Sequence, residues 1–391
     1  MKSIDKYFII SYFPAFAFFS TNSNEALRLS GTVLLAAFQL LLFFQYAKPV
    51  IRKRPLFFYL IFVLVPLVRS YLSGTISLPF VASLSFQIGI FVLYVSMLCS
   101  KVDAEIVFEN FSKSIHVLVI IFFATYLMGF YVPQEYEDQA VILNMLGISV
   151  NRVHFLFSPG INSTGYLAGY VVLNSTFRIG KNISSFNLLS LFAGLAVLLL
   201  TDSRGAIFSV FLVILLFKTG LIQSFFKTIY FHPVIIGLVL GLVFYMLINA
   251  SGGIESLARG KYPLGGREFI WYFGATNIVS DIKHLLIGYG YLGQSISEVY
   301  KNYEFVFGLN RDAETMSLHN YILQTIYDVG ILGLAVLYYM IKGQCFQGRP
   351  YVELFLAYIL LLGILEVSLN IYSFYFFSLL IVTISSGEKT S

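Results

Sequence analysis

Long apolar stretches separated by short polar segments occupy most of the chain. Many approach the roughly 20 residues that a helix needs to cross a bilayer. The pattern predicts an all-α, polytopic membrane protein with about twelve transmembrane helices. The candidate spans are 7–20, 29–47, 55–72, 78–100, 114–132, 162–179, 184–201, 205–222, 231–250, 320–341, 351–368 and 371–386. The first resembles a signal peptide in charge order but lacks a small-residue cleavage site, so we interpret it as a retained helix.

The positions of lysine and arginine predict the orientation. With a cytoplasmic N-terminus, fifteen of the 25 basic residues fall on the inner side and ten at the outer side. Six of these ten lie in one long loop, where the positive-inside rule has little force, so the short loops divide fifteen to four. We therefore expect both termini, and both Cys99 and Cys345, on the cytoplasmic side, with no disulfide.

Two segments on the expected outer side, 133–161 and 251–319, are longer than ordinary connections. The second contains a run around Trp271 that is too apolar for disorder, so we expect helices lying against the membrane face. No internal repeat, low-complexity tract or proline-rich linker separates a soluble domain. Residues 1–391 are therefore interpreted as a single transmembrane helical domain with its function at the outer face.

Composition narrows the chemistry. The residues are 58% hydrophobic and 12% charged, and the net charge of +5 follows from basic inner loops, so no nucleic-acid partner is expected. The sequence GYGYLG at 288–293 fits a dinucleotide motif but lacks the strand and helix context, so we interpret it as a turn that permits close backbone approach. No phosphate-binding loop or Cys/His cluster occurs in the sequence, and we expect no metal and no cofactor.

Charged residues at the expected outer helix ends are the candidate functional residues. Asp202 and Arg204 lie in LLLTDSRGAI, between two apolar runs. In one interpretation Arg204 reaches the lipid headgroups from an ordinary turn; in the other, packed helices hold it in a site and Asp202 orients it. Both interpretations remain open at this point.

Further basic residues share that side. Arg152 begins RVHFLFSPGIN, Arg267 begins REFIW, and His319 and Asn320 lie in SLHNYI. A lone histidine at such a position is more often incidental than catalytic. Three arginines with one histidine at a common face, however, suit an anionic substrate such as a pyrophosphate, because guanidinium groups bind phosphate oxygens through paired donors.

The order of these motifs over residues 150–342 resembles that of the O-antigen polymerase and O-antigen ligase superfamily. The resemblance implies a bundle like that of GT-C glycosyltransferases, in the bacterial plasma (inner) membrane, with its active site on the periplasmic face. It also implies metal-independent transfer of a glycan from undecaprenyl pyrophosphate. Polymerases extend a lipid-linked repeat unit, whereas ligases transfer the glycan to a lipid A core.

The same resemblance implies roles for individual residues. His319, Arg204 and Arg267 would be catalytic, with His319 as the base, and inversion at the anomeric carbon follows as a hypothesis. Pyrophosphate or glycan binding would fall to Arg152, Asp202 and Asn320. The implied partners are the undecaprenyl-pyrophosphate-linked glycan, membrane lipid and a chain-length regulator protein.

Alternatives remain. We prefer a polymerase of O-antigen or capsule repeat units, on the Phe- and Tyr-rich pattern, with O-antigen ligase as the alternative. From another class, a flippase for lipid-linked oligosaccharides is favoured by Asp328 within a span and disfavoured by the long segment 251–319. Asp328 and Glu366 either pair with an outer arginine or hold helices together, and the sequence does not choose.

Overall fold

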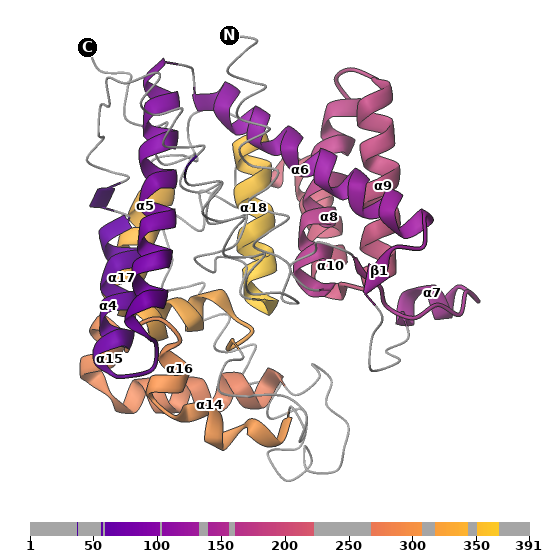
Figure 1. Ribbon diagram of the computed structural model, residues 1–391. Coiled ribbons are helices and arrows are strands. Elements are labelled where there is room, and N and C mark those ends of the chain that lie inside the picture. Colours follow the sequence, from indigo (N-terminus) through magenta and orange to yellow (C-terminus); the bar gives the residue numbers. More distant parts are fainter. Residues whose placement is uncertain are drawn as a thin grey trace.

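The part of the chain that the structure describes is built mostly of helices (Figure 1). The computed structural model describes residues 59–101, 104–132, 140–155, 161–222, 267–306, 317–342 and 350–366, with Ala37, Leu56 and Phe57. The elements are η1 (Leu60–Leu64), α4 (Val65–Leu72), α5 (Leu78–Lys101), α6 (Ala104–Leu127), β1 (Tyr131–Val132), α7 (Val141–Met145), β2 (His154–Phe155), α8 (Ile161–Ile179), α9 (Ser185–Thr201), α10 (Arg204–Lys218), α14 (Arg267–Ser280), α15 (Ile282–Ile287), α16 (Gly293–Ile296), η2 (Val299–Asn302), η3 (Glu304–Val306), α17 (Tyr321–Lys342) and α18 (Pro350–Leu365).

Helices occupy the candidate spans that lie in the described part of the chain. The spans 7–20, 231–250 and 371–386 lie outside it, as does 29–47 except for Ala37. By length and composition, two described helices could cross a membrane, Ile106–Leu127 and Tyr321–Tyr338. Shorter apolar helices cover Leu60–Leu72, Ser185–Thr201 and Val352–Gly363. The fold is therefore consistent with an all-α membrane protein, while the number of spans and a GT-C-like bundle stay predictions.

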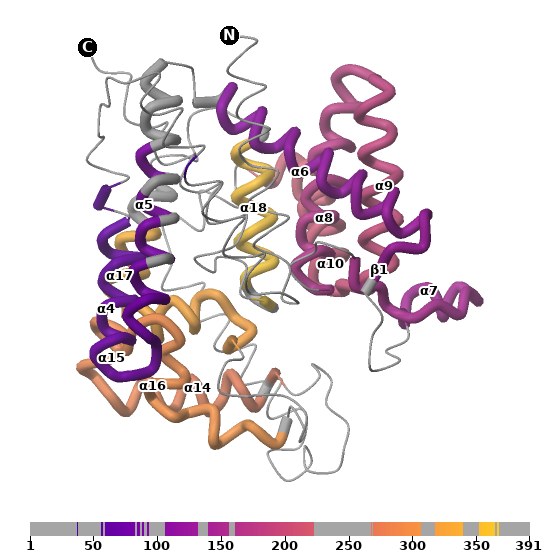
Figure 2. The backbone as a smooth tube through the Cα atoms, viewed as in Figure 1, coloured from indigo at the N-terminus to yellow at the C-terminus, as the bar shows by residue number. Residues whose placement is uncertain are grey.

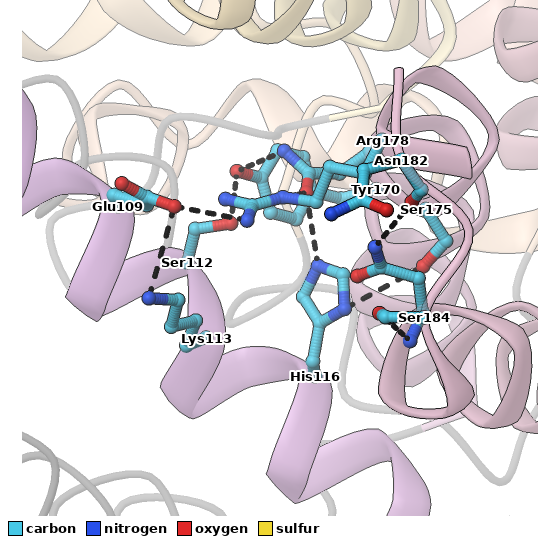
Figure 3. Close-up of polar contacts among 11 residues, drawn as sticks. Glu109, Ser112, Lys113, His116, Tyr170, Ser175, Arg178, Asn182 and Ser184 are labelled. Atoms are coloured by element: carbon cyan, nitrogen blue, oxygen red, sulfur yellow. Dashed lines mark hydrogen bonds and ion pairs between the residues drawn. The ribbon is translucent and has the colours of Figure 1, made fainter. Parts of the chain in front are cut away.

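Helix α6 begins at Ala104, so the predicted start at residue 114 is wrong. Its first turns carry polar side chains that pair with the end of α8 (Figure 3). Glu109 lies 3.0 Å from the Arg178 guanidinium, and Ser112 Oγ accepts a hydrogen bond from the Tyr170 hydroxyl, also of α8, over 2.8 Å. The hydropathy pattern did not include residues 104–113 in the predicted span because they carry polar side chains. In the structure these side chains are paired with groups of another helix, α8.

Helix α8 is central to the bundle, because it packs against α6, α9, α10 and α18. Close approach depends on glycines: a Cβ on Gly169 would lie 2.3 Å from the Tyr358 hydroxyl, and one on Gly194 would lie 3.1 Å from Val172. Buried side chains of α6, α8, α10 and α18 contribute to one hydrophobic core. This packing fixes the N-terminal end of α8, where the candidate site lies.

Residues 267–306 form a helical module that packs against the first half of α17 and lies across one end of the bundle (Figures 1 and 2). The helices agree with the apolar character of this segment; residues 251–266 and 307–316 lie outside the described ranges. The module has its own core, formed by Phe269, Ile270, Trp271, Ile278, Val299, Tyr303, Leu318 and Tyr327. Its position on the outer side of a membrane stays a prediction.

Two glycines allow the module to approach α17 closely. Helix α17 is interrupted at Gly330, where φ is 74° and a Cβ would lie 2.2 Å from the Leu286 carbonyl oxygen. In the GYGYLG segment, φ of Gly288 is 72° and a Cβ would lie 2.5 Å from the backbone of Asp328. These contacts confirm that GYGYLG forms a turn that permits close backbone approach.

The only β-sheet in the described ranges is a short antiparallel pair, β1 with β2. Tyr131 pairs with Phe155 and Val132 with His154. The pair brings the segment after α6 beside the segment that enters α8. Arg152, two residues before β2, is thereby placed next to the end of α9, since Val153 N donates to the Leu200 carbonyl over 2.9 Å.

Candidate active site

The loop between α9 and α10 holds Asp202 in place and leaves Arg204 accessible. Asp202 has a φ of 47°, and its carboxylate accepts hydrogen bonds from the backbone N–H groups of Val141 and Ile142, each over 3.2 Å. The Arg204 Nε lies 3.9 Å from Asp202 Oδ2, and its side chain is 72% exposed against 2% for Asp202. Asp202 therefore anchors the start of α7 and interacts only weakly with Arg204.

Arg152 is bound to the same loop from the other side. Its Nε donates to the Thr201 carbonyl over 2.9 Å, and its Nη2 donates to Asn162 Oδ1 over 2.7 Å. A positive charge at the C-terminal carbonyls of α9 complements the helix dipole. Arg152 thus ties the end of α9 to the first turn of α8, and its predicted contact with pyrophosphate stays a prediction.

A second cluster is centred on Glu366, the residue that follows α18. The Glu366 carboxylate lies 2.5 Å from Arg267 Nη2 through one oxygen and 3.3 Å from His319 Nδ1 through the other. The Tyr166 side chain also interacts with this carboxylate. The Glu366 side chain is 7% exposed, so it is a buried carboxylate held by an arginine and a histidine. Of the two possibilities for Glu366, pairing with an arginine is therefore the observed one.

His319 adopts a strained backbone conformation. Its φ is 51°, in the left-handed region, which costs a residue with a side chain about 1–3 kcal/mol. Among the described residues other than glycine, only Asp202, Leu292, Glu298 and His319 have positive φ, and two of these are predicted site residues. Such conformations persist where surrounding contacts hold them, and they concentrate at functional sites.

Asn320 acts as the N-cap of α17. Its Oδ1 accepts a hydrogen bond from the Leu323 N–H over 3.0 Å, and the residue is 7% exposed. This is the usual role of an asparagine just before a helix. Its predicted part in substrate binding stays a prediction, and the structure gives it a local structural role beside His319.

The two clusters meet at the N-terminal turns of α8. Asn162 contacts Arg152 and Tyr166 contacts Glu366, and residues four apart share one face of a helix. Between them, a Cβ on Gly165 would lie only 2.2 Å from Ser203 Cβ, so the α9–α10 loop rests directly on α8. The structure thus gathers the predicted arginines and His319 around one helix end.

Asp328 lies away from this cluster. Its Oδ1 accepts from the Gly293 N–H over 3.2 Å and from Gln324 Nε2 over 2.9 Å, so the carboxylate joins the helical module to α17. Holding elements together is therefore its observed role, and it gives no support to a transporter. In the part of the chain that the structure describes, no group of three or more metal-ligating side chains occurs.

Sequence reasoning did not assign roles to Glu366 and Tyr166. Glu366 gave a weak signal, a carboxylate near the end of an apolar run, but its partners are 99 and 47 residues away in sequence. Tyr166 gave none, since one of 27 tyrosines in an apolar helix carries no pattern. Long-range pairing of this kind appears only when the helices are assembled.

The comparisons with known proteins cover part of the chain. The model of the O-antigen ligase family matches residues 189–338, a range that includes Asp202, Arg204, Arg267 and His319. Two relatives, from Rickettsia typhi and Rickettsia prowazekii, are both 29% identical over 173 residues and are both named "Putative polysaccharide ligase". The match covers 43% of this chain, and the chain spans only 40% of each relative. No solved structure matches.

These findings support the resemblance to the O-antigen polymerase and ligase superfamily. They do not support the preference for the polymerase branch, because the family description and both relatives' names refer to ligases. The ligase alternative fits at least as well.

Proposed function

We propose that this protein is a membrane glycosyltransferase of the ligase type, which transfers a glycan from undecaprenyl pyrophosphate to an acceptor hydroxyl at the outer face of the bacterial plasma membrane. The observation that carries the proposal is the Glu366 carboxylate, which bridges Arg267 and His319. A histidine oriented by a carboxylate is suited to accept a proton, and an adjacent arginine is suited to bind phosphate. We place ligase before polymerase because the matching family and the named relatives are ligases.

His319 is the proposed base. The Glu366 carboxylate can only accept a hydrogen bond, so Nδ1 carries the proton and Nε2 of the neutral ring is left as an acceptor. The acceptor hydroxyl gives its proton to Nε2 while its oxygen bonds to the anomeric carbon. Glu366 then stabilises the imidazolium, as carboxylates do in catalytic triads. Base catalysis of this kind contributes roughly a hundredfold to ten-thousandfold in rate, and attack opposite the leaving group inverts the anomeric carbon.

The arginines act on the leaving group. When the bond between the anomeric carbon and the phosphate oxygen breaks, the electron pair stays on undecaprenyl pyrophosphate. The positive charges of Arg267 and the exposed Arg204 bind the leaving group more strongly as negative charge develops on its phosphate. The polyprenyl chain stays in the bilayer because leaving it would expose apolar surface to water. Membrane lipid is therefore a partner, whereas a chain-length regulator belongs to the polymerase alternative.

The test uses purified protein in detergent with a synthetic undecaprenyl-pyrophosphate glycan and no added metal. One reaction contains a lipid A core acceptor, and another contains a second lipid-linked repeat unit. We expect transfer to the first. His319→Ala and Arg267→Lys should each lower kcat about a hundredfold or more. Growth of the lipid-linked repeat alone would identify the polymerase instead.

The matched control is Arg178→Lys. Arg178 also pairs with a glutamate, Glu109, over 3.0 Å, but it lies sixteen residues after Asn162, about 24 Å along α8. Its substitution should leave transfer largely intact. Movement of the intact lipid-linked sugar across liposomes, without a new glycosidic bond, would contradict the proposal and support a transporter. Full activity of His319→Ala would contradict the assigned base.

A further inference from the structure

We propose that Gln324 and Trp271 are positioning residues for His319: together they bind both backbone polar groups of Leu318 and so hold the next residue in its left-handed conformation. This inference rests on the proposed function, because it concerns the geometry of the proposed base. Neither residue touches the reacting atoms. Both act through the backbone that precedes His319.

Leu318 is bound on both sides of its backbone. The Leu318 N–H donates to Gln324 Oε1 over 3.0 Å, and the Leu318 carbonyl accepts from Trp271 Nε1 over 3.0 Å. The leucine side chain is fully buried in the core of the helical module. Both backbone polar groups of Leu318, which belong to the peptide groups on either side of its Cα, are therefore satisfied by side chains, away from competing water.

The Gln324 amide can take only one orientation. Its Nε2 donates to Asp328 Oδ1 and to Gln294 Oε1, each over 2.9 Å. Both partners are oxygens, so the NH₂ group must face them and Oε1 must face the Leu318 N–H. Gln294 is fully buried and Gln324 is 7% exposed. Asp328 thus acts on the loop indirectly, by orienting Gln324.

Helix α14 supplies both the arginine that contacts Glu366 and the tryptophan that contacts Leu318. Trp271 follows Arg267 by four residues, so the two side chains lie on one face, one turn apart. Arg267 reaches Glu366 and Trp271 reaches Leu318. One rigid helix therefore fixes the position of the carboxylate's arginine and of the backbone that precedes the histidine.

The left-handed φ of His319 follows from these constraints. Leu318 belongs to the module core, whereas Asn320 is fixed as the N-cap of α17. His319 is the single residue between two fixed peptides, so it must absorb the change in chain direction. Without the Gln324 and Trp271 contacts, the residue would relax toward an ordinary φ, and its ring would leave Glu366.

The test compares three conservative variants. Gln324→Met removes the acceptor for Leu318 N–H, and Trp271→Phe removes the donor to its carbonyl. The control, Tyr327→Phe, removes the hydrogen bonds of the Tyr327 hydroxyl to the Gly274 carbonyl (2.8 Å) and to Asn277 Oδ1 (3.0 Å). These bonds belong to the same module core but involve neither backbone polar group of Leu318. We expect the first two to lower kcat about tenfold or more, because small displacements of a catalytic group are costly. KM for the lipid-linked glycan should be unchanged, and the control should keep its kcat.

A double variant separates a positioning effect on His319 from a general effect on the stability of the protein. If Gln324 acts through the histidine, adding Gln324→Met to His319→Ala should cause no further loss of kcat, since groups that act as a unit are not additive. A further loss in the double variant would overturn the inference, as would an equal loss of kcat in Tyr327→Phe.

A labelling experiment keeps this inference distinct from the proposed function. Diethyl pyrocarbonate modifies accessible imidazoles, and the His319 side chain is 21% exposed. Peptide mass spectrometry should show faster modification of His319 in Gln324→Met and Trp271→Phe than in the wild type or Tyr327→Phe. Absence of glycosyl transfer by the wild type would refute the proposed function alone. Equal labelling rates in all four proteins would refute the positioning role.

Discussion

Gly165 determines how closely α8 approaches the loop that carries Asp202 and Arg204. A Cβ at this position would lie 2.2 Å from Ser203 Cβ and 2.8 Å from Thr201 Oγ1. Real side-chain atoms do not approach so closely, so any larger residue must displace the loop. The α9–α10 loop and α8 are therefore placed relative to each other by the lack of a side chain at one residue.

We predict that Gly165→Ala destabilises the protein by about 1–3 kcal/mol, as overpacking of a well-packed core does. It should also lower transfer activity, because Arg204 moves with the loop. Gly180→Ala is the control, since the nearest atom to its added Cβ would be a backbone oxygen at 3.5 Å. Thermal unfolding in detergent measures both. Equal shifts in Tm for the two variants would contradict this account of Gly165.

At the residue scale, the sequence indicated that Arg267 and His319 lie near each other but not which residue they both contact. Arg267 and His319 were singled out by residue type and expected side, and they share a carboxylate. That carboxylate could not be assigned in advance, because its partners come from other helices. The capping role of Asn320 was readable locally, since an asparagine directly before an apolar run is a helix-start signal.

At the scale of elements, hydropathy located helices well where their partners are apolar, as in α8 and α9. It did not predict the start of α6, whose polar residues Glu109 and Ser112 pair with Arg178 and Tyr170 of α8. It also could not show the break at Gly330, because positive φ in a glycine leaves no trace in an apolar pattern. Helix α15 is held differently, by a cap. Asp281 accepts from the His284 backbone N–H over 3.2 Å and from its ring over 2.6 Å.

The Asp281 cap leads to a prediction about pH. The hydrogen bonds from His284 lower the pKa of Asp281 below its ordinary value of 3.8. A carboxyl group whose folded pKa is depressed stabilises the fold above its unfolded pKa and loses that effect as pH falls through the folded value. Burial and the bond to Asp281 raise the pKa of Tyr289 to about 12, so its hydroxyl keeps donating.

Protection of the α15 amides, corrected for intrinsic exchange, should therefore be constant from about pH 8 to pH 5. Asp281→Ala should reduce it throughout this range. Ser184→Ala, which removes the corresponding cap of α9, should leave α15 unaffected. Hydrogen exchange with mass spectrometry measures both. Protection in the wild type that falls steadily between these pH values would show that another group controls α15.

At the scale of the whole molecule, large apolar side chains remain on the outside of the bundle. Phe192 of α9 is 62% exposed and Phe211 of α10 is 66% exposed. Exposed surface of this kind suits lipid rather than water. Trp271, the single tryptophan of the sequence, is in contrast 5% exposed inside the helical module. The sequence could indicate a membrane environment and an apolar module. It could not show which apolar residues face lipid and which form the core of the module.

We predict that a tryptophan in place of Phe192 is quenched by brominated lipids, whereas native Trp271 is not. Tryptophan fluorescence is compared between the wild type and Phe192→Trp, each reconstituted in vesicles of brominated lipid. The wild type gives the signal of Trp271, and the difference between the two gives that of residue 192. Strong quenching of the wild type would place the module core in contact with acyl chains and contradict its separate packing.

The charge balance around Glu366 makes the substitutions of its neighbours interdependent. With Arg267 present, the pair is neutral, and a diphosphate meets no net repulsion from it. Replacing Arg267 by a neutral residue removes one attraction and also uncovers a negative charge that repels the same ligand. Neutralising both residues together would therefore weaken diphosphate binding less than neutralising the arginine alone.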